Sequence, residues 1–175
     1  KNTTIGVVIP ELNHHFFASV LDGIEQTANE AGYNILICQS GETKEKEIQN
    51  VQMLLNSRVA GMLVGVSKET LNLQHLQDVI NSSIPLVLYD RPCPSLACDQ
   101  VVSDDYTGAY NAVEYLIQTG CKRIVYFSSP MQLEVAHRRY QGWRDALQRY
   151  GLWDEHTTIR TCDTRANAII ETPIV

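Results

Sequence analysis

Polar, charged and aromatic side chains gather directly after the apolar runs of this sequence, at the points where buried strands would end. Carboxylates and guanidinium groups make directed, charge-assisted hydrogen bonds to hydroxyl groups, and an aromatic face can cover the apolar side of a ring-shaped ligand. These residue types therefore predict a site for a polar, hydroxylated ligand. The segments concerned are residues 10–17, 39–40, 65–68, 90–91, 103–105 and 128–139.

The pair Asp90 and Arg91 follows the apolar run 85–89 and places an acid and a base side by side. From the residues alone, two interpretations are open. The pair could be a surface ion pair, which contributes little to stability, or it could present both charges to a ligand. The same choice applies to Arg138 and Arg139 in a predicted helix, where one of the two is expected to face solvent.

Histidine and aromatic side chains open the first predicted helix. Phe17 falls on the inner apolar stripe of that helix, so Phe16 or His15 is the better candidate for stacking on a ligand. The neighbouring residues His14 and His15 do not predict a metal site, because no acidic or cysteine residue stands at metal-ligand spacing from them.

Ser103, Asp104 and Asp105 open a later predicted helix. An aspartate at this position can accept hydrogen bonds from the free N–H groups of the first turn, and its charge suits the helix dipole. Ser103 or Asp104 is therefore a candidate either for capping the helix or for contacting the ligand.

A catalytic motif is not found in this chain. A nucleotide-using enzyme would carry a glycine-rich turn after its first strand, whereas this chain has the glycine-free segment Pro10 to Asn13 there. It also has no Gly-x-Ser-x-Gly turn and no supported Cys/His pair. We therefore predict no enzymatic activity and no cofactor.

Charge and composition restrict the partners of the chain. Its 175 residues carry 14 Lys and Arg against 20 Asp and Glu, a net charge of −6, so these residues are not expected to bind DNA themselves. No apolar run reaches the roughly 18 residues that span a membrane, and residues 1–4 do not resemble a signal peptide. The 5 cysteines include no Cys-x-x-Cys pair, which fits neither a disulfide framework nor a zinc site and predicts a reducing cytosol.

Apolar runs alternate with helical periodicity along the first part of the chain. The uninterrupted run from Ile5 to Ile9 ends at Pro10 and is typical of a strand buried on both faces of a parallel sheet. Short loops and regular alternation favour a doubly wound α/β fold with right-handed crossovers. Strands are predicted at 5–9, 33–38, 60–64, 85–89 and 100–102, with helices from Phe17 to Gly32, at 44–56 and at 71–80.

The alternation restarts after the loop 92–99, which holds two prolines and two cysteines. We therefore expect one sheet to end and a second to begin near Val102. The second part is predicted to contain helices at 104–120 and 134–150 and strands at 123–127 and 157–160. The domains expected are an N-terminal lobe at 1–102, part of a C-terminal lobe at 103–163, and a final strand or tail at 164–175 that follows a missing segment.

Several short stretches occur in an order and spacing that resemble one family. They are Thr4 to Pro10 (TIGVVIP), Phe16-Phe17 with Gly23-Ile24-Glu25, Val59 to Val64 (VAGMLV), Ile84 to Arg91 (IPLVLYDR), Gly108 with Tyr115-Leu116-Ile117 and Gly120, Arg123-Ile124, and Arg139 to Trp143 (RYQGW). With them the sequence resembles the effector-binding domain of the lactose/galactose-repressor (LacI/GalR) family, which shares its fold with ribose-type periplasmic binding proteins.

The resemblance implies a two-lobed, periplasmic-binding-protein-like fold of type I and a function in transcription. A bacterial regulator of this kind binds a small effector, here expected to be a sugar, in the cleft between its lobes. The effector changes the angle between the lobes and so the DNA binding of two helix-turn-helix heads in a homodimer. Those heads are absent from this chain. The alternative is a periplasmic sugar-binding protein of a transport system, and purine effectors also occur in the family.

The resemblance also assigns site residues. Asn13, His15 and Phe16 match the part of the first lobe that lines the cleft, and Asp90 with Arg91 matches the acid and base that contact sugar hydroxyls in ribose-binding relatives. Arg139 matches an arginine that holds the effector from the second lobe.

Two departures from the family pattern concern the second lobe. Family members often have Asp-Asn after the crossover strand, where this chain has Ser103-Asp104, so the hydrogen-bond pattern expected there is in doubt. The second lobe is also expected to be incomplete, because residues 164–175 resemble the final strand of the family, which normally lies far downstream. Either a segment is missing near Thr164 or the tail is a natural terminus with a chance similarity.

Overall fold

The computed structural model describes residues 3–154 and 159–174 of the chain. It divides into two compact units, unit 1 at Lys1–Val102 and unit 2 at Ser103–Val175. The division falls at the residue where the sequence predicts one sheet to end. Each unit is an α/β structure with parallel strands, so the predicted fold class is confirmed.

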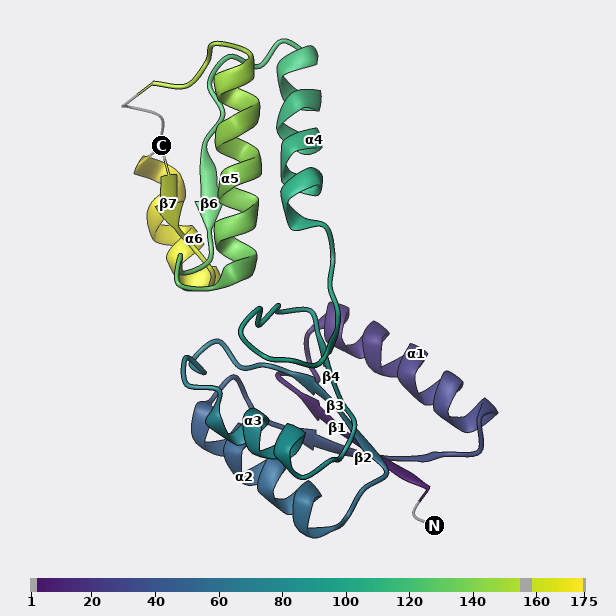
Figure 1. Cartoon of the computed structure of the whole chain (residues 1–175). Coiled ribbons are helices and arrows are strands. Elements are labelled where there is room, and N and C mark those ends of the chain that lie inside the picture. Colours follow the sequence, from purple (N-terminus) through teal and green to yellow (C-terminus); the bar gives the residue numbers. More distant parts are fainter. Residues whose placement is uncertain (1–2, 155–158, 175) are drawn as a thin grey trace. The chain divides into compact units, whose positions relative to one another are not determined.

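Unit 1 is built on one five-stranded sheet in the order β2-β1-β3-β4-β5, and every neighbouring pair is parallel (Figure 1). The strands are β1 (Thr4–Ile9), β2 (Asn34–Gln39), β3 (Gly61–Gly65), β4 (Leu86–Tyr89) and β5 (Asp99–Val101). The chain moves outward from β1 to β2 and then returns past β1 to β3. In a sheet with this order, ligands bind at the carboxyl ends of the strands near the reversal.

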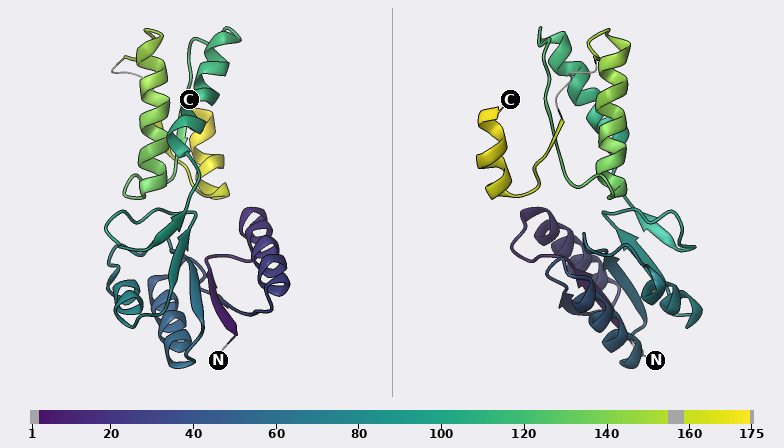
Figure 2. Two further views of the ribbon diagram at one scale, coloured as in Figure 1. Left: turned by 45° about the vertical axis from the view of Figure 1, so that its right-hand side comes forward. Right: turned by 90° about the vertical axis from the view of Figure 1, so that its left-hand side faces the viewer.

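Three helices cover the two faces of this sheet. They are α1 (His15–Glu30), α2 (Lys44–Asn56) and α3 (Gln74–Asn81). Figure 2 shows α1 on one face and α2 with α3 on the other. The larger core lies on the α2–α3 side, where Leu54 and Leu76 pack with Val64 and Leu88 of the sheet. Burying one such side chain contributes about 1.5–3 kcal/mol.

The opposite face of the sheet is covered by α1 through a smaller core. Phe17 of this helix is 4% exposed and packs against Ile9 and Tyr89. These contacts fix the start of α1 beside the carboxyl ends of β1 and β4.

Unit 2 contains two long helices and a two-stranded parallel sheet, β6-β7. Its elements are α4 (Asp105–Gln118), β6 (Tyr126–Ser128), α5 (Glu134–Arg149), β7 (Ile159–Thr161), α6 (Arg165–Glu171) and the 3-10 turn Thr172–Ile174. Trp143 of α5 is buried at the centre of this unit. Its ring stacks on Tyr126 with centroids 5.3 Å apart and meets the edge of Trp153 at 5.4 Å.

Helix α3 and strand β6 are shorter than the sequence predicts. Helix α3 begins at Gln74 rather than at residue 71, since the Asn72 side chain accepts a hydrogen bond from the Gln74 N–H at 2.9 Å and forms a turn before the helix. Strand β6 is limited to Tyr126–Ser128, and two residues of the strand predicted at 157–160 lie outside the described residues.

The strand predicted within 164–175 is wrong, because Arg165–Glu171 is a helix. Thr164 caps it by accepting a hydrogen bond from the Asn167 N–H at 3.1 Å. The Thr164 cap and the two alanines of the segment favour a helix, which the apolar pair Ile169 and Ile170 alone does not predict. Both isoleucines are more than 60% exposed, at 66% and 63%. A missing segment near Thr164 stays a prediction.

All five cysteines are free thiols. Within the described ranges, no helix combines the length and apolar character needed to cross a membrane.

The crossing of α4 and α5 depends on Gly142, and this generates a prediction. A Cβ atom here would lie 2.9 Å from the Tyr110 nitrogen and closer still to the Tyr106 carbonyl oxygen. We expect Gly142→Ala to lower the free energy of unfolding by about 1–3 kcal/mol, because backbone on both helices must move. Gly108→Ala on α4 is the matched control, since nothing lies within 4 Å of its Cβ and alanine favours a helix. Urea unfolding would contradict the prediction if both variants were equally stable.

Candidate functional site

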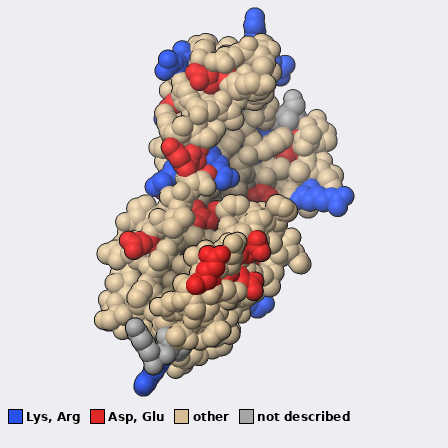
Figure 3. All heavy atoms as spheres, turned by 90° about the vertical axis from the view of Figure 1, so that its right-hand side faces the viewer, with Lys and Arg blue, Asp and Glu red and all other residues tan. Residues whose placement is uncertain are grey.

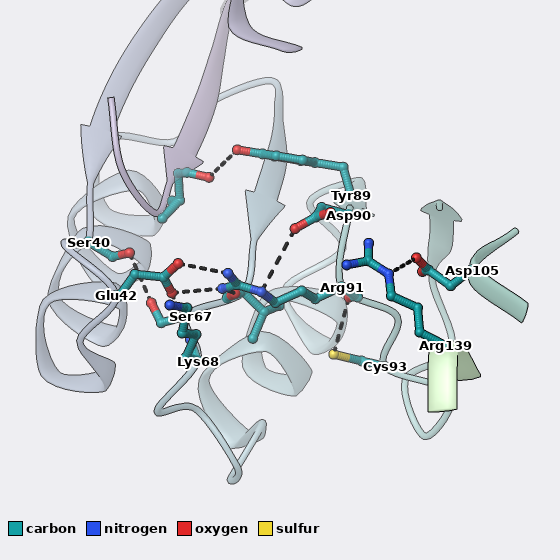
Figure 4. Close-up of polar contacts among 12 residues, drawn as sticks. Ser40, Glu42, Ser67, Lys68, Tyr89, Asp90, Arg91, Cys93, Asp105 and Arg139 are labelled. Atoms are coloured by element: carbon teal, nitrogen blue, oxygen red, sulfur yellow. Dashed lines mark hydrogen bonds and ion pairs between the residues drawn. The ribbon is translucent and has the colours of Figure 1, made fainter. Parts of the chain in front are cut away.

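The carboxyl end of the unit 1 sheet holds a bidentate ion pair centred on Arg91. Arg91 donates from Nη1 to Glu42 Oε2 and from Nη2 to Glu42 Oε1, both at 2.7 Å (Figure 4). Nη1 also donates to the Val66 carbonyl oxygen at 2.6 Å. Because the two side chains are only 14% and 13% exposed, this pair is shielded from water, and its geometry is the two-pronged arrangement that makes arginine–carboxylate contacts strong.

The turn after β2 places Glu42 in that position. Gly41 and Glu42 both have left-handed backbone, with φ of 62° and 61°, and this conformation is uncommon for a residue other than glycine. Oε2 of Glu42 also accepts a hydrogen bond from the Lys68 N–H at 2.8 Å. Burial raises the pKa of Glu42, but the hydrogen bonds and positive charges of Arg91 and Lys68 outweigh it, so the pKa lies below its ordinary value.

Asp90 lies at the end of β4 and also has left-handed backbone, with φ of 69°. Aspartate tolerates this conformation better than most residues. The Asp90 N–H donates to the Val101 carbonyl oxygen at 3.0 Å, and its Oδ2 lies 3.8 Å from Arg91 Nε. The acid and base predicted as a pair are therefore neighbours, but the fork of Arg91 points to Glu42, which the sequence did not single out.

A second polar network lies deeper under the same edge. The Glu47 side chain is fully buried; its Oε2 accepts from the Ser67 N–H at 2.5 Å, and its Oε1 lies 2.7 Å from His75 Nε2. Ser67 Oγ in turn donates to Ser40 Oγ at 2.9 Å. These hydrogen bonds link the turns after β2 and β3 to each other and to α3. They also position the backbone of Val66 and Lys68, which contacts the Arg91–Glu42 pair.

The Tyr89 hydroxyl ties the ends of two strands together. It donates to the Val8 carbonyl oxygen at 2.9 Å, and its ring passes so close to Gly65 that a Cβ there would lie 2.8 Å from Tyr89 Cζ. Burial raises the pKa of Tyr89, so this phenol stays a donor at neutral pH.

The start of α1 presents the residues predicted from unit 1 to contact a ligand. Asn13, His15 and Phe16 are all exposed, and Phe16 keeps 42% of its surface. Phe17 is buried, as the helical spacing predicts, and the Arg91 guanidinium lies 5.8 Å from the centroid of its ring. Asn13, His15 and Phe16 therefore have side-chain surface available for a ligand, whereas Phe17 supports Arg91.

In unit 2 the predicted arginine is also paired with a carboxylate. Arg139 donates from Nε to Asp105 Oδ1 at 2.6 Å; Asp105 is buried, whereas the Arg139 side chain is 50% exposed. Arg138 pairs with Glu134 on its own helix at 2.9 Å. Of the two neighbouring arginines, Arg139 is therefore the one held at the start of α4.

Asp104 caps α4. It accepts a hydrogen bond from the Thr107 N–H at 3.0 Å, and this contact is the main cause that lowers its pKa. Ser103 and Asp104 are both exposed at this end of the helix. Capping, one of the two roles left open for these residues, is therefore present, and contact with a ligand stays a prediction.

The partner carboxylates are what sequence reasoning missed. Glu42 lies two residues beyond the predicted ligand-binding segment 39–40. Asp105 lies within the predicted segment 103–105, but the sequence did not identify it as the partner of Arg139. The signal for Glu42 was its place after Gly41 in a turn at a strand end. In the part of the chain that the structure describes, no three His, Cys, Asp or Glu side chains form a group that could hold a metal ion.

Two successive α/β units with parallel sheets are the architecture of periplasmic-binding-protein-like domains. Comparison with known families makes the assignment specific. The family model of periplasmic binding proteins and the sugar binding domain of the LacI family matches residues 2–171. The chain belongs to this family.

Individual relatives agree with the family. The HTH-type transcriptional repressor PurR of Vibrio atlanticus (strain LGP32) is 31% identical over 175 residues, which cover 96% of this chain and 52% of that protein. The chain thus spans about half the length of this curated relative.

Two solved structures are similar over nearly the whole chain. A periplasmic binding protein/LacI transcriptional regulator from Alkaliphilus metalliredigens QYMF, complexed with D-xylulofuranose, has 26% identity and a TM-score of 0.78, covering 97% of this chain and 61% of that one. Transcription regulator CcpA of Lactococcus lactis shares the fold, with a TM-score of 0.88 at 24% identity, covering 99% of this chain and 64% of that one.

The lowered pKa of Glu42 predicts an acid-sensitive contribution to stability. A carboxyl group whose pKa is lower in the folded than in the unfolded chain stabilises above the unfolded value, about 4.3 for glutamate, and this contribution is lost as the pH falls through the folded value. We expect the free energy of unfolding to fall less steeply between pH 6 and pH 3.5 in Glu42→Gln than in the wild type. Glu45→Gln, an exposed charge on α2, should follow the wild type; equal slopes for all three proteins would contradict the prediction.

Proposed function

We propose that this chain is the effector-binding part of a cytoplasmic bacterial transcription regulator of the LacI type. It binds a small ligand, a sugar, and catalyses no reaction of that ligand. Membership of the family supports the ligand class, and the curated relative reported above is a repressor. DNA would be bound by a helix-turn-helix that is not in this chain. Because the chain spans about half of that relative, the regulatory function belongs to the whole protein.

The observation that carries the proposal is the pre-positioned acid and base at the end of β4. Asp90 offers carboxylate oxygens that accept hydroxyl donors, and Arg91 is held beside it by Glu42 and the Val66 carbonyl. In unit 2, Arg139 donates from Nε to Asp105, and the two terminal nitrogens of its guanidinium group lie on the side away from that carboxylate (Figure 4). Directed donors and acceptors of this kind suit a ligand with several hydroxyl groups.

Further contacts are proposed from exposed residues of both units. Asn13, His15 and Phe16 would contribute from the start of α1, with an aromatic ring available for stacking on a sugar. Ser103 and Asp104 would contribute hydrogen bonds from the start of α4.

The surface charge of unit 1 agrees with a role that leaves DNA to another module. Figure 3 shows carboxylates rather than basic side chains gathered on the face that includes α1. Exposed Asp22, Glu25 and Glu30 lie on this helix. A face of this charge repels the phosphates of DNA.

A periplasmic sugar-binding protein is the second candidate function, because the matching family model describes both kinds of protein. Both would use the same ligand chemistry. The complete gene separates them: a helix-turn-helix upstream of Lys1 supports the regulator, and a secretion signal supports transport.

We also propose that the whole protein is a homodimer that associates through α2 and α3. Ile48 and Met53 lie exposed on α2, at 36% and 43%. We expect the double substitution Ile48→Glu and Met53→Glu to convert the full-length protein from dimer to monomer in sedimentation velocity. Lys46→Glu, exposed on the same helix, should stay dimeric. A double variant that sediments as a dimer would rule out this surface.

The effector site predicts that two substitutions weaken ligand binding without unfolding the protein. A thermal-shift screen of pentoses, hexoses and nucleosides on the full-length protein identifies the effector. We expect Asp90→Asn and Arg139→Gln each to weaken its binding roughly 10–100-fold in calorimetry, since each removes a charge-assisted hydrogen bond. Asparagine also accepts the left-handed backbone of position 90.

Matched controls for this experiment come from exposed charges away from the strand ends. Asp22→Asn on α1 and Arg149→Gln at the end of α5 should bind the effector as tightly as the wild type. If Asp90→Asn and Arg139→Gln kept wild-type affinity too, the proposed site would be wrong.

A further inference from the structure

The two terminal nitrogens of a guanidinium group can donate a pair of parallel hydrogen bonds either to a carboxylate or to two oxygens of a phosphate. The same pair of N–H donors cannot bind both anions at once. In unit 1 the fork of Arg91 is occupied. Nη1 and Nη2 both donate to the Glu42 carboxylate, and Nη1 donates in addition to the Val66 carbonyl oxygen. A phosphate could use these donors only after Glu42 had left.

Glu42 is held in place independently of Arg91. Its Oε2 accepts from the Lys68 N–H at 2.8 Å, and its backbone is fixed in the left-handed turn with Gly41. The side chain is only 13% exposed. Displacing it from Arg91 would leave a largely buried carboxylate without its bidentate cation, which is a costly state.

The local charge balance also disfavours an anion. Two carboxylates, those of Glu42 and Asp90, accompany Arg91, and the ammonium group of Lys68 brings the balance of these side chains to neutral (Figure 4). A phosphate dianion would therefore meet no surplus of positive charge. The phosphoryl group of a sugar phosphate dianion also has no O–H to donate to a carboxylate, whereas each hydroxyl of an uncharged sugar has one.

The arginine of unit 2 is balanced in a similar way. Arg139 donates to buried Asp105, and Arg138 is paired with Glu134. Asp104 adds a further carboxylate at the start of α4. Neither of the two arginines is therefore left as an uncompensated anion-binding charge.

We infer that Glu42 is a specificity-determining residue: by occupying the fork of Arg91, it selects an uncharged, hydroxylated ligand over a phosphorylated one. The inference rests on the proposed function, because it concerns the ligand of that site. Glu42 acts through Arg91 and is a positioning residue, whereas Asp90 is the acid expected to accept hydroxyl donors.

The first test needs no knowledge of the effector, because inorganic phosphate is the probe. Phosphate is titrated calorimetrically into the full-length wild type, Glu42→Gln and Glu45→Gln at constant ionic strength. We expect Glu42→Gln to bind phosphate at least tenfold more tightly than the other two, since glutamine no longer neutralises the guanidinium. Glu45→Gln removes the same charge from an exposed position on α2. The double variant Glu42→Gln/Arg91→Gln should lose the gain, which assigns it to the freed fork.

The second test uses the wild type alone and so does not depend on the folding of a variant. D-ribose is compared with D-ribose 5-phosphate, D-fructose with fructose 1-phosphate, and adenosine with its 5′-monophosphate. For each pair in which binding is detected, we expect the uncharged member to bind with a dissociation constant at least tenfold lower than that of the phosphorylated member.

The outcomes separate this inference from the proposed function. Tighter binding of a phosphorylated member, or a Glu42→Gln variant that binds phosphate no better than Glu45→Gln, overturns the inference and leaves a small-molecule effector in place. If Glu42→Gln gains phosphate binding but no sugar or nucleoside binds the wild type, the role of Glu42 stands and the proposed effector class is wrong.

Discussion

The site in unit 1 depends on the common direction of its five strands. Because every pair in the order β2-β1-β3-β4-β5 is parallel, the turns that follow β2, β3 and β4 all open at one edge. Glu42, Val66 and Arg91 are far apart in sequence and meet there. The apolar core under the sheet maintains this arrangement, since a shift of one strand would separate the carboxylate from the guanidinium.

Polar contacts at this edge are arranged in two levels. The inner level is built on buried Glu47, which links the turn at Ser67 to His75 of α3. The outer level is the Glu42–Arg91 pair, which uses the backbone that the inner level has fixed. A buried carboxylate is costly unless its oxygens are hydrogen-bonded, so the inner contacts constrain the loop conformations far more strongly than exposed ion pairs would.

The sequence predicted the parallel α/β fold and the order of its elements, because uninterrupted apolar runs and helical spacing are local signals. Phe17 as a core residue also follows from helical spacing, whereas contact of Arg139 with an effector, which the resemblance implied, stays a prediction. The partners Glu42 and Asp105 could not be assigned in the same way, since a pairing across the chain leaves no periodic pattern. The helix at 165–171 was missed because its cap at Thr164, not its apolar residues, defines it.

The aromatic core of unit 2 makes the two halves of the chain spectroscopically unequal. Both tryptophans of the sequence, Trp143 and Trp153, lie in unit 2, and the centroids of their rings are 5.4 Å apart. Tryptophan emission therefore follows the packing of α5 against its neighbours and is insensitive to local opening of the sheet in unit 1. Circular dichroism registers the helices of both units. If the units unfold separately, the two signals will have different midpoints, and their difference measures how far each unit stabilises itself.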